Sequence, residues 1–231
     1  MSETATANPH RNAGRPRASG VKASPETRRQ ILDAAAALFV RRGFAGASTQ
    51  AIAAAAGLRQ PTLFHYFPTK DAILEALYMA SLDEPLAAFA RIEALPAPAP
   101  VRLYAAIYAD TAFLSATAVT QKAIFLLPEL GQPRFAGVRA ARERLIATYA
   151  RMIAQGMESG DFRPGDAGLL ARLVMSLDEA PIDIAAAKPS AESGEQARIV
   201  ADFALSALLL PPARLDEIRV AGLALLNLTR T

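Results

Sequence analysis

Hydrophobic residues recur every three or four positions through most of the chain, which is the spacing of one face of an α-helix. Between positions 25 and 42 this spacing is kept by five apolar residues: Ile31, Leu32, Ala35, Leu38 and Phe39. No stretch of useful length alternates apolar and polar residues, as a half-buried strand would. The pattern therefore predicts an all-α fold.

Capping residues and prolines divide this pattern into separate helices. Ser24 and Pro25 begin the first helix, because serine is a common N-cap and proline fits the first turn. We expect the helix over 166–186 to bend or break at Pro181, since proline lacks the N–H that a helix interior uses. The same signals predict helices over 25–42, 49–56, 59–66, 70–92, 101–119, 120–127, 134–159, 166–186, 195–210 and 214–229.

Charge is distributed unevenly along the 231 residues, although the net charge is only +3. The first 70 residues contain ten basic and three acidic side chains, whereas the other 161 contain 15 basic and 19 acidic ones. Residues 1–23 lack apolar periodicity and are rich in polar and small residues, which predicts a disordered basic tail. A basic first third indicates that this end of the protein meets a polyanion.

Composition excludes several kinds of site. The chain has no cysteine, and its two histidines, His10 and His65, are too far apart in sequence for most metal sites or a catalytic triad. We therefore expect no enzyme activity, metal or cofactor. Apolar runs such as 203–210 are shorter than the roughly 18 residues of a membrane span, and the N-terminus lacks an apolar signal segment. These features predict a cytoplasmic protein with no membrane partner.

Two short predicted helices, 49–56 and 59–66, are joined by a tight turn at Gly57. This spacing is typical of a helix-turn-helix, whose second helix presents its N-terminal residues to the major groove of DNA, although any helical hairpin can share it. Arg59 and Gln60 favour DNA binding, because their side chains match the edges of guanine and adenine. Pro61 and the methyl group of Thr62 suit the methyl group of thymine.

Helical spacing also divides the second of these helices into two faces. Leu63 and Phe67, one turn apart, are predicted to face inward with Phe64 beside them. The side chains left for the outer face are Arg59, Gln60, Thr62, His65 and Tyr66.

The stretch from residue 31 to residue 77 resembles the DNA-binding domain of the TetR family of bacterial repressors. The resemblance is carried by Ile52-Ala53, Ala56-Gly57-Leu58, the run from Pro61 to Phe67, and Thr69-Lys70-Asp71. It implies an all-α homodimer with a DNA-binding domain over 24–70 and a ligand-binding and dimerisation domain over 71–231. It further implies a palindromic double-stranded DNA operator that is released when a small-molecule effector binds.

The resemblance also implies DNA contacts at individual positions. Gln60, Pro61 and Thr62 lie where the family touches bases or the adjoining backbone, and His65 and Tyr66 lie where it touches phosphate or bases. For His65, a plain surface histidine is the alternative.

At other positions the resemblance leaves more open. Lys70 lies where the family meets phosphate, with a plain surface lysine as the alternative, and Thr49 is either a phosphate contact or a capping residue. The family usually has tyrosine at position 64 and often serine at position 59, where this chain has Phe64 and Arg59. The first difference puts a phosphate contact in doubt, and the second alters the expected sequence preference.

In the tail, Gly14-Arg15-Pro16-Arg17 resembles the Gly-Arg-Pro core of minor-groove hooks. Arg15 and Arg17 would then enter a narrow, A·T-rich minor groove. A tail that merely keeps the protein soluble is the alternative.

Two sets of polar residues stand out in the second half. Tyr104, Tyr108, Thr111 and Ser115 follow nearly one helical face, which suits a ligand cavity, with packed or partly exposed tyrosines as the alternative. Asp178, Glu179 and Asp183 interrupt an apolar helix that the family resemblance places at the dimer interface. These acids either pair with Arg172 or Arg198 across the two-fold axis or line a solvated face.

The leading hypothesis is therefore a ligand-responsive, homodimeric repressor at the cytoplasmic nucleoid. A helical small-molecule carrier or enzyme without DNA binding is one alternative, but it leaves the basic first third unexplained. A dimer that organises DNA without a ligand is the other, and a dry, closed second domain would favour it.

Overall fold

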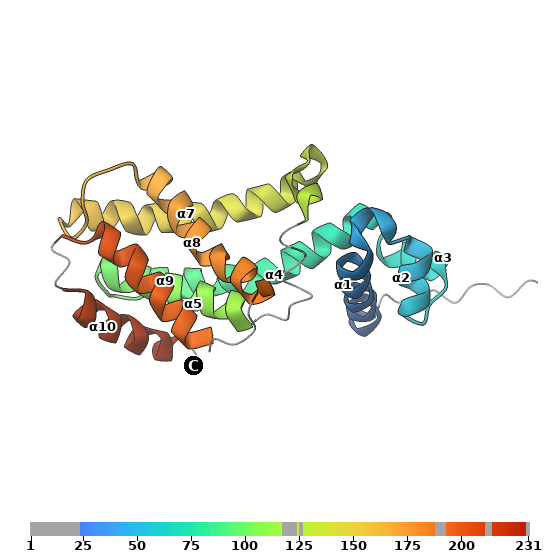
Figure 1. Ribbon diagram of the computed structural model, residues 1–231, viewed down its shortest axis with the longest axis horizontal. Helices are drawn as coiled ribbons and strands as arrows, with labels where there is room; N and C mark the ends of the chain where they lie inside the picture. The colour runs from blue at the N-terminus through green and yellow to red at the C-terminus, as the bar shows by residue number, and fades with distance from the viewer. Residues whose placement is uncertain (1–23, 117–123, 125–126, 188–192, 211–213, 230–231) are drawn as a thin grey trace, which may run out of the picture.

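The computed structural model consists of two helical bodies joined by one long helix, α4 (Lys70–Glu93) (Figure 1). It describes residues 24–116, 124, 127–187, 193–210 and 214–229. Within these ranges the chain forms no strand, and its single bridge joins Phe162 to Leu209. The predicted all-α fold is confirmed.

The smaller body contains α1 (Pro25–Gly46), α2 (Thr49–Ala55) and α3 (Gln60–Tyr66), which pack with the first turns of α4. Its core contains fully buried aliphatic side chains from all four helices, such as Ile31, Ile52, Leu63 and Ile73. The regular part of α1 ends near the predicted position, because Gly43 has a positive φ of 68° that a side chain would strain. One further turn follows, and it buries Phe44.

In the larger body, α5 (Ala99–Ala116) lies at the centre and packs against every other long helix of that body. Its fully buried alanines, Ala105 and Ala106, let neighbouring backbones approach closely. The surrounding helices are α4, α7 (Ala136–Glu158), α8 (Ala167–Ala187), α9 (Ser193–Leu208) and α10 (Leu215–Leu228). Because most of α5 is buried, polar side chains on its inner faces need partners inside the protein.

Three parts of the predicted helix pattern differ from the structure or lie outside it. Between the predicted helices 120–127 and 134–159, a pair of short 3₁₀ helices, Pro128–Gly131 and Pro133–Phe135, leads into α7. The helix predicted over 120–127 lies mainly outside the described residues. The expected break at Pro181 is wrong, since α8 continues through this residue to Ala187. Buried Pro85 likewise lies inside α4, so one missing N–H does not end a helix that packing holds in place.

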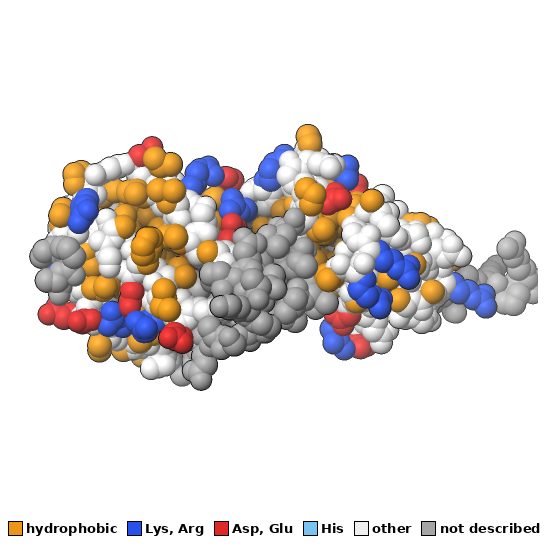
Figure 2. Space-filling model, viewed as in Figure 1, with side chains coloured by type: hydrophobic (Ala, Val, Ile, Leu, Met, Phe, Trp, Pro, Cys, Tyr) orange, Lys and Arg blue, Asp and Glu red, His pale blue; other side chains and the backbone are white. Residues whose placement is uncertain are grey.

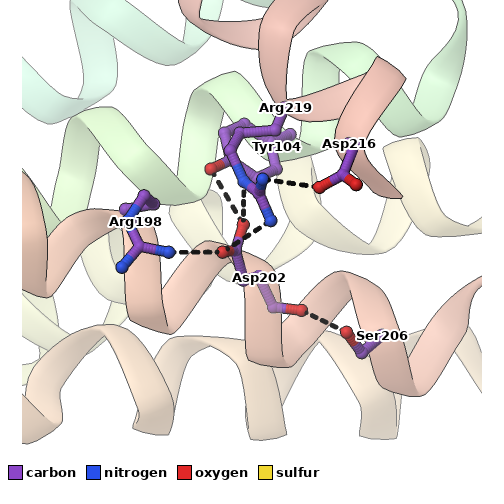
Figure 3. Close-up of polar contacts among 6 residues, drawn as sticks. All are labelled: Tyr104, Arg198, Asp202, Ser206, Asp216 and Arg219. Atoms are coloured by element: carbon purple, nitrogen blue, oxygen red, sulfur yellow. Dashed lines mark hydrogen bonds and ion pairs between the residues drawn. The ribbon is translucent and has the colours of Figure 1, made fainter. Parts of the chain in front are cut away.

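A polar cluster around Asp202 fastens α9 and α10 to α5 (Figure 3). The Asp202 carboxylate accepts hydrogen bonds from the Tyr104 hydroxyl at 3.1 Å, from Arg198 at 3.0 Å and from Arg219 at 2.9 Å. Gly222 of α10 lies against the Tyr104 ring, where a Cβ atom would come within 2.7 Å of it. The cluster and this close approach fix the position of the last helix.

Among the helices in the described part of the chain, none is both long and apolar enough to cross a membrane.

Candidate nucleic-acid interface

The turn between α2 and α3 has the local geometry of a helix-turn-helix. Ser48 caps α2, because its hydroxyl accepts a hydrogen bond from the Ala51 N–H at 3.1 Å. Gly57 has a φ of 70°, in the left-handed region that favours glycine, and the next N–H, of Leu58, bonds to the Ala53 carbonyl at 2.8 Å. This turn lets α3 cross α2 within a few residues.

The faces of α3 differ from the prediction at one residue. Leu63 and Phe67 are buried as expected, but Phe64 is 43% exposed. Leu63 and Phe67 already occupy the inward face, and Phe64 lies about 100° further around the helix. The expectation that Phe64 packs inward is therefore wrong. The exposed residues at the start and along the outer side of α3 are Arg59, Pro61, Phe64 and His65.

Gln60 is held in place by the preceding helix. Its side-chain amide donates a hydrogen bond to the Thr49 hydroxyl at 2.8 Å, and both residues are half-buried. Ser48, rather than Thr49, caps α2. Thr49 thus orients Gln60, a role that sequence alone does not reveal because 11 positions separate the two residues.

Tyr66 joins the end of α3 to the start of α1. Its hydroxyl accepts a hydrogen bond from the Ser24 N–H at 2.9 Å, and its ring meets that of His65 edge to face. Ser24 is the first described residue, so the described chain starts beside α3. Arg15 and Arg17 lie outside the described residues.

Lys70 binds the last turn of α1. Its ammonium group donates to the Phe44 carbonyl at 2.7 Å and lies 4.4 Å from the centre of the Phe44 ring. Lysine near a helix C-terminus stabilises unpaired carbonyl groups and the helix dipole. Lys70 therefore has a structural role that its position in the sequence did not indicate, and its ammonium group remains half-buried beside the turn.

The smaller body is basic. Residues 24–70 contain six basic and two acidic side chains, and Figure 2 shows Lys and Arg side chains grouped on this body. Arg41 and Arg42, at the end of the regular part of α1, are exposed. No motif marked these two arginines, and only their charge and position indicate a role near a polyanion.

Known proteins share these features. Residues 31–77 match the sequence model of the family described as "Bacterial regulatory proteins, tetR family". The transcriptional regulator UidR of Escherichia coli K12 is 36% identical over 63 residues, which cover 27% of this chain and only 32% of UidR. The transcriptional repressor KstR2 of Mycobacterium tuberculosis H37Rv is 27% identical over 152 residues, or 64% of this chain and 75% of KstR2. The crystal structure of Mycobacterium smegmatis AmtR matches with 33% identity and a TM-score of 0.72, over 92% of this chain and 98% of AmtR.

The chain belongs to the TetR family of bacterial regulatory proteins. Membership of this family confirms the helix-turn-helix and the DNA-binding regulatory function that the sequence predicts.

In this TetR-family regulator the four polar residues of α5 do not line one cavity. Tyr104 is fully buried with its hydroxyl on Asp202, and the Thr111 hydroxyl donates to Asp178 at 2.9 Å. Ser115 is half-buried, and Tyr108 lines a cavity of about 760 Å³ between α4, α5 and α10. A shared ligand-facing stripe is therefore wrong, because Asp202 of α9 binds the Tyr104 hydroxyl, Asp178 of α8 binds the Thr111 hydroxyl, and only Tyr108 lines the cavity.

The acidic residues of α8 face the interior of the same chain. Asp178 is fully buried and accepts hydrogen bonds from Thr111 and Tyr149, whereas Glu179 forms a two-point ion pair with Arg142 at 2.7 and 3.0 Å. Neither a solvated face nor pairing across a two-fold axis describes these two acids.

The arginines suggested as partners across the axis are also engaged within the chain. Arg172 pairs with Glu143 at 2.7 Å, and Arg198 pairs with Asp202 at 3.0 Å. The side chain of Asp183 lies outside the described residues.

Proposed function

We propose that this regulator is a homodimeric repressor that binds a palindromic operator and releases it when a small molecule binds its larger body. The observation that carries the proposal is α3, a short helix on a basic body that offers Arg59 and Gln60 from its first turn. KstR2, a relative that spans most of this chain, is itself named a transcriptional repressor. We place the DNA-binding domain at 24–70, the ligand-binding and dimerisation domain at 71–231, and the protein at the cytoplasmic nucleoid, where it acts by binding rather than catalysis.

Within the DNA interface we assign base contacts to the first turn of α3. Arg59 is exposed and Gln60 is aimed by Thr49, so both can reach purine edges in the major groove. Pro61 and Thr62 follow in the same turn. The residues we assign to phosphate or flanking contacts are Thr49, His65, Tyr66 and Lys70.

The tail extends this interface. The Tyr66 hydroxyl accepts a hydrogen bond from the Ser24 N–H, so the first described residue lies beside the end of α3. We therefore assign Arg15 and Arg17 to the adjacent minor groove, where a basic extended segment meets enhanced negative potential.

Dimerisation is supported by an exposed apolar surface on α8 and α9. Leu169, Leu173, Ile199 and Phe203 are 53 to 65% exposed and make up what we call the α8–α9 face. A groove of about 340 Å³ lies between these two helices, and hydrophobic side chains cluster on the larger body in Figure 2. A contiguous apolar surface of this kind marks an interaction site, and a two-fold axis lets one surface cover its own copy.

Helix α4 can carry the effect of a ligand to the DNA. Pro85 and Phe89 in its second half line the 760 Å³ cavity, while Lys70 at its start holds α1. Asp71 in its first turn is paired with Arg134, which precedes α7, at 3.0 Å. A shift of α4 on ligand binding would therefore move the smaller body and change the spacing of the two α3 helices in the dimer.

We expect Arg59→Ala and Gln60→Ala each to weaken binding to the cognate operator by about 1–3 kcal/mol per half-site, because each removes a purine contact. On scrambled DNA, Gln60→Ala should bind almost as the unaltered protein does, since a neutral side chain releases no counterion. Arg59→Ala should bind scrambled DNA slightly more weakly than the unaltered protein, because it lacks one positive charge. Titration of both DNAs at one salt concentration measures this.

Glu26→Gln, at an exposed acid near the start of α1, is the matched control and should retain operator preference. Equal losses on cognate and scrambled DNA for both variants would contradict sequence reading by this part of α3.

A further inference from the structure

The larger body buries a carboxyl group that has a single long hydrogen bond among the described residues. Asp110 of α5 is only 4% exposed. Within the described residues, the one hydrogen-bond partner of its carboxyl group is the Tyr149 hydroxyl, at 3.5 Å. That hydroxyl also lies 2.5 Å from Asp178, and the shorter contact competes for its single proton. Among the described residues Asp110 thus has one long hydrogen bond, which is weak for a buried carboxyl group.

Two cavities meet at Asp110. A small one of about 20 Å³ lies between α4, α5, α7 and α8, bordered by Leu82, Met175 and the Arg142–Glu179 ion pair, and it has room for about one water-sized group. The larger one of about 760 Å³ lies between α4, α5 and α10. Asp110 and Pro85 border both. A bound molecule can therefore place a small polar group at Asp110 and a larger apolar part in the second cavity.

The charges around Asp110 leave negative charge in excess. Glu179 is neutralised by its two-point pair with Arg142. Asp178 accepts hydrogen bonds from two hydroxyl groups, but burial and the neighbouring Asp110 raise its pKa well above the ordinary value. Among the described residues Asp110 has no ion-pair partner and one long hydrogen bond, and burial raises its pKa to about 7. A buried carboxylate without a counter-charge is unfavourable, so a cation in the small cavity would stabilise it.

The lining of the larger cavity also favours a molecule that is positively charged and partly apolar. The larger cavity contains the aromatic residues Phe89, Tyr108 and Phe113, whose ring faces attract cations as well as apolar groups. At its rim, Arg91 is paired with Glu84 at 3.0 Å. The basic side chain of this cavity is therefore already engaged, which disfavours an anionic ligand.

We infer that the effector is an organic cation whose protonated amine binds Asp110 from the small cavity while its apolar body fills the larger one. This inference rests on the proposed ligand-responsive function and names the chemical class of the ligand. A primary ammonium group fits the water-sized space, and a bulky quaternary one does not.

The test uses straight-chain primary amines from hexylamine to dodecylamine, each with the alcohol and the carboxylate of the same length, titrated into the full-length protein. We expect at least one amine to bind about tenfold or more tightly than its alcohol and carboxylate, because only the amine gains a charge-assisted bond. Asp110→Asn should remove that preference. Asp83→Asn, the same change at an exposed position of α4 outside both cavities, should keep it.

A pH series gives a second readout. The groups that face Asp110 are Tyr78 of α4, Tyr149 and Arg142 of α7, and Asp178 and Glu179 of α8. Since the amine binds the carboxylate form and Asp110 titrates near pH 7, amine affinity should rise from pH 6 to pH 8 and stay flat in Asp110→Asn.

Equal binding of amines and alcohols, absence of amine binding, or an unchanged preference in Asp110→Asn would each overturn the inference. Operator binding by the ligand-free protein is measured separately. A protein that binds its operator but no amine overturns only the cation site, whereas a protein that binds amines but no operator overturns only the proposed repressor function.

Discussion

Phe203→Asp is expected to convert the proposed dimer into monomers. Phe203 is the most exposed residue of the α8–α9 face, at 65%, and the two-fold axis would bury one copy from each subunit. Loss of an aromatic anchor costs about 2–4 kcal/mol, and the new carboxylates would be buried without partners. With two copies per interface, dimerisation should weaken by roughly a thousandfold or more. Sedimentation at micromolar protein concentration measures the change.

Operator binding should fall with dimerisation. A monomer reaches one half-site, so it loses the effective concentration that links the two recognition helices. Val220→Asp is the matched control, because Val220 is 70% exposed on α10, outside the α8–α9 face. The proposed interface is contradicted if the Phe203 variant stays dimeric and keeps full operator affinity, or if both variants dissociate alike.

Asp110→Asn is expected to stabilise the protein at neutral and alkaline pH. The pKa of Asp110 in the folded protein is about 7, whereas an aspartate in an unfolded chain titrates near 3.9. The folded state therefore binds more protons between these values, and this group lowers stability as the pH rises from about 4 to about 7. The full penalty, of the order of 4 kcal/mol, is reached above pH 7.

Asparagine has nearly the same shape and carries no charge, so it should remove this penalty. Urea unfolding at pH 4.5, 6 and 8 measures the difference between the two proteins. We expect the variant to gain little at pH 4.5 and a few kcal/mol at pH 8. Equal stability of the two proteins at pH 8 would mean that Asp110 has a charge partner in solution, which contradicts the geometry described above.

Local signals were sufficient to predict most helices of the smaller body. Ser48, Gly57 and Pro61 each act within a few residues of themselves, as an N-cap, a left-handed turn and a first-turn proline. The inward positions of Leu63 and Phe67 follow from helical spacing alone. The family motif covers the same stretch, so both kinds of argument agree there.

The wrong expectations for α5 concern contacts between residues distant in sequence. Spacing places Tyr104 and Thr111 on one side of α5. It does not reveal that their hydroxyl groups bind aspartates of two different helices, Asp202 of α9 and Asp178 of α8. The family resemblance placed Lys70 at phosphate, which stays a prediction, and it did not reveal that the Lys70 ammonium group binds carbonyls at the end of α1. Helical spacing predicts which residues share one face of a helix, but it does not predict which neighbouring helix that face contacts.

The central claim is that two copies of α3 read a two-fold symmetric DNA sequence. The direct test is selection of binding sites from a random double-stranded DNA library by the full-length protein, followed by footprinting of the enriched sequences. The account predicts an inverted repeat whose half-site centres lie about one helical turn or more apart, protected by a dimer and lost with Arg59→Ala. Enrichment of no sequence, or of a single asymmetric half-site bound by one subunit, would contradict it.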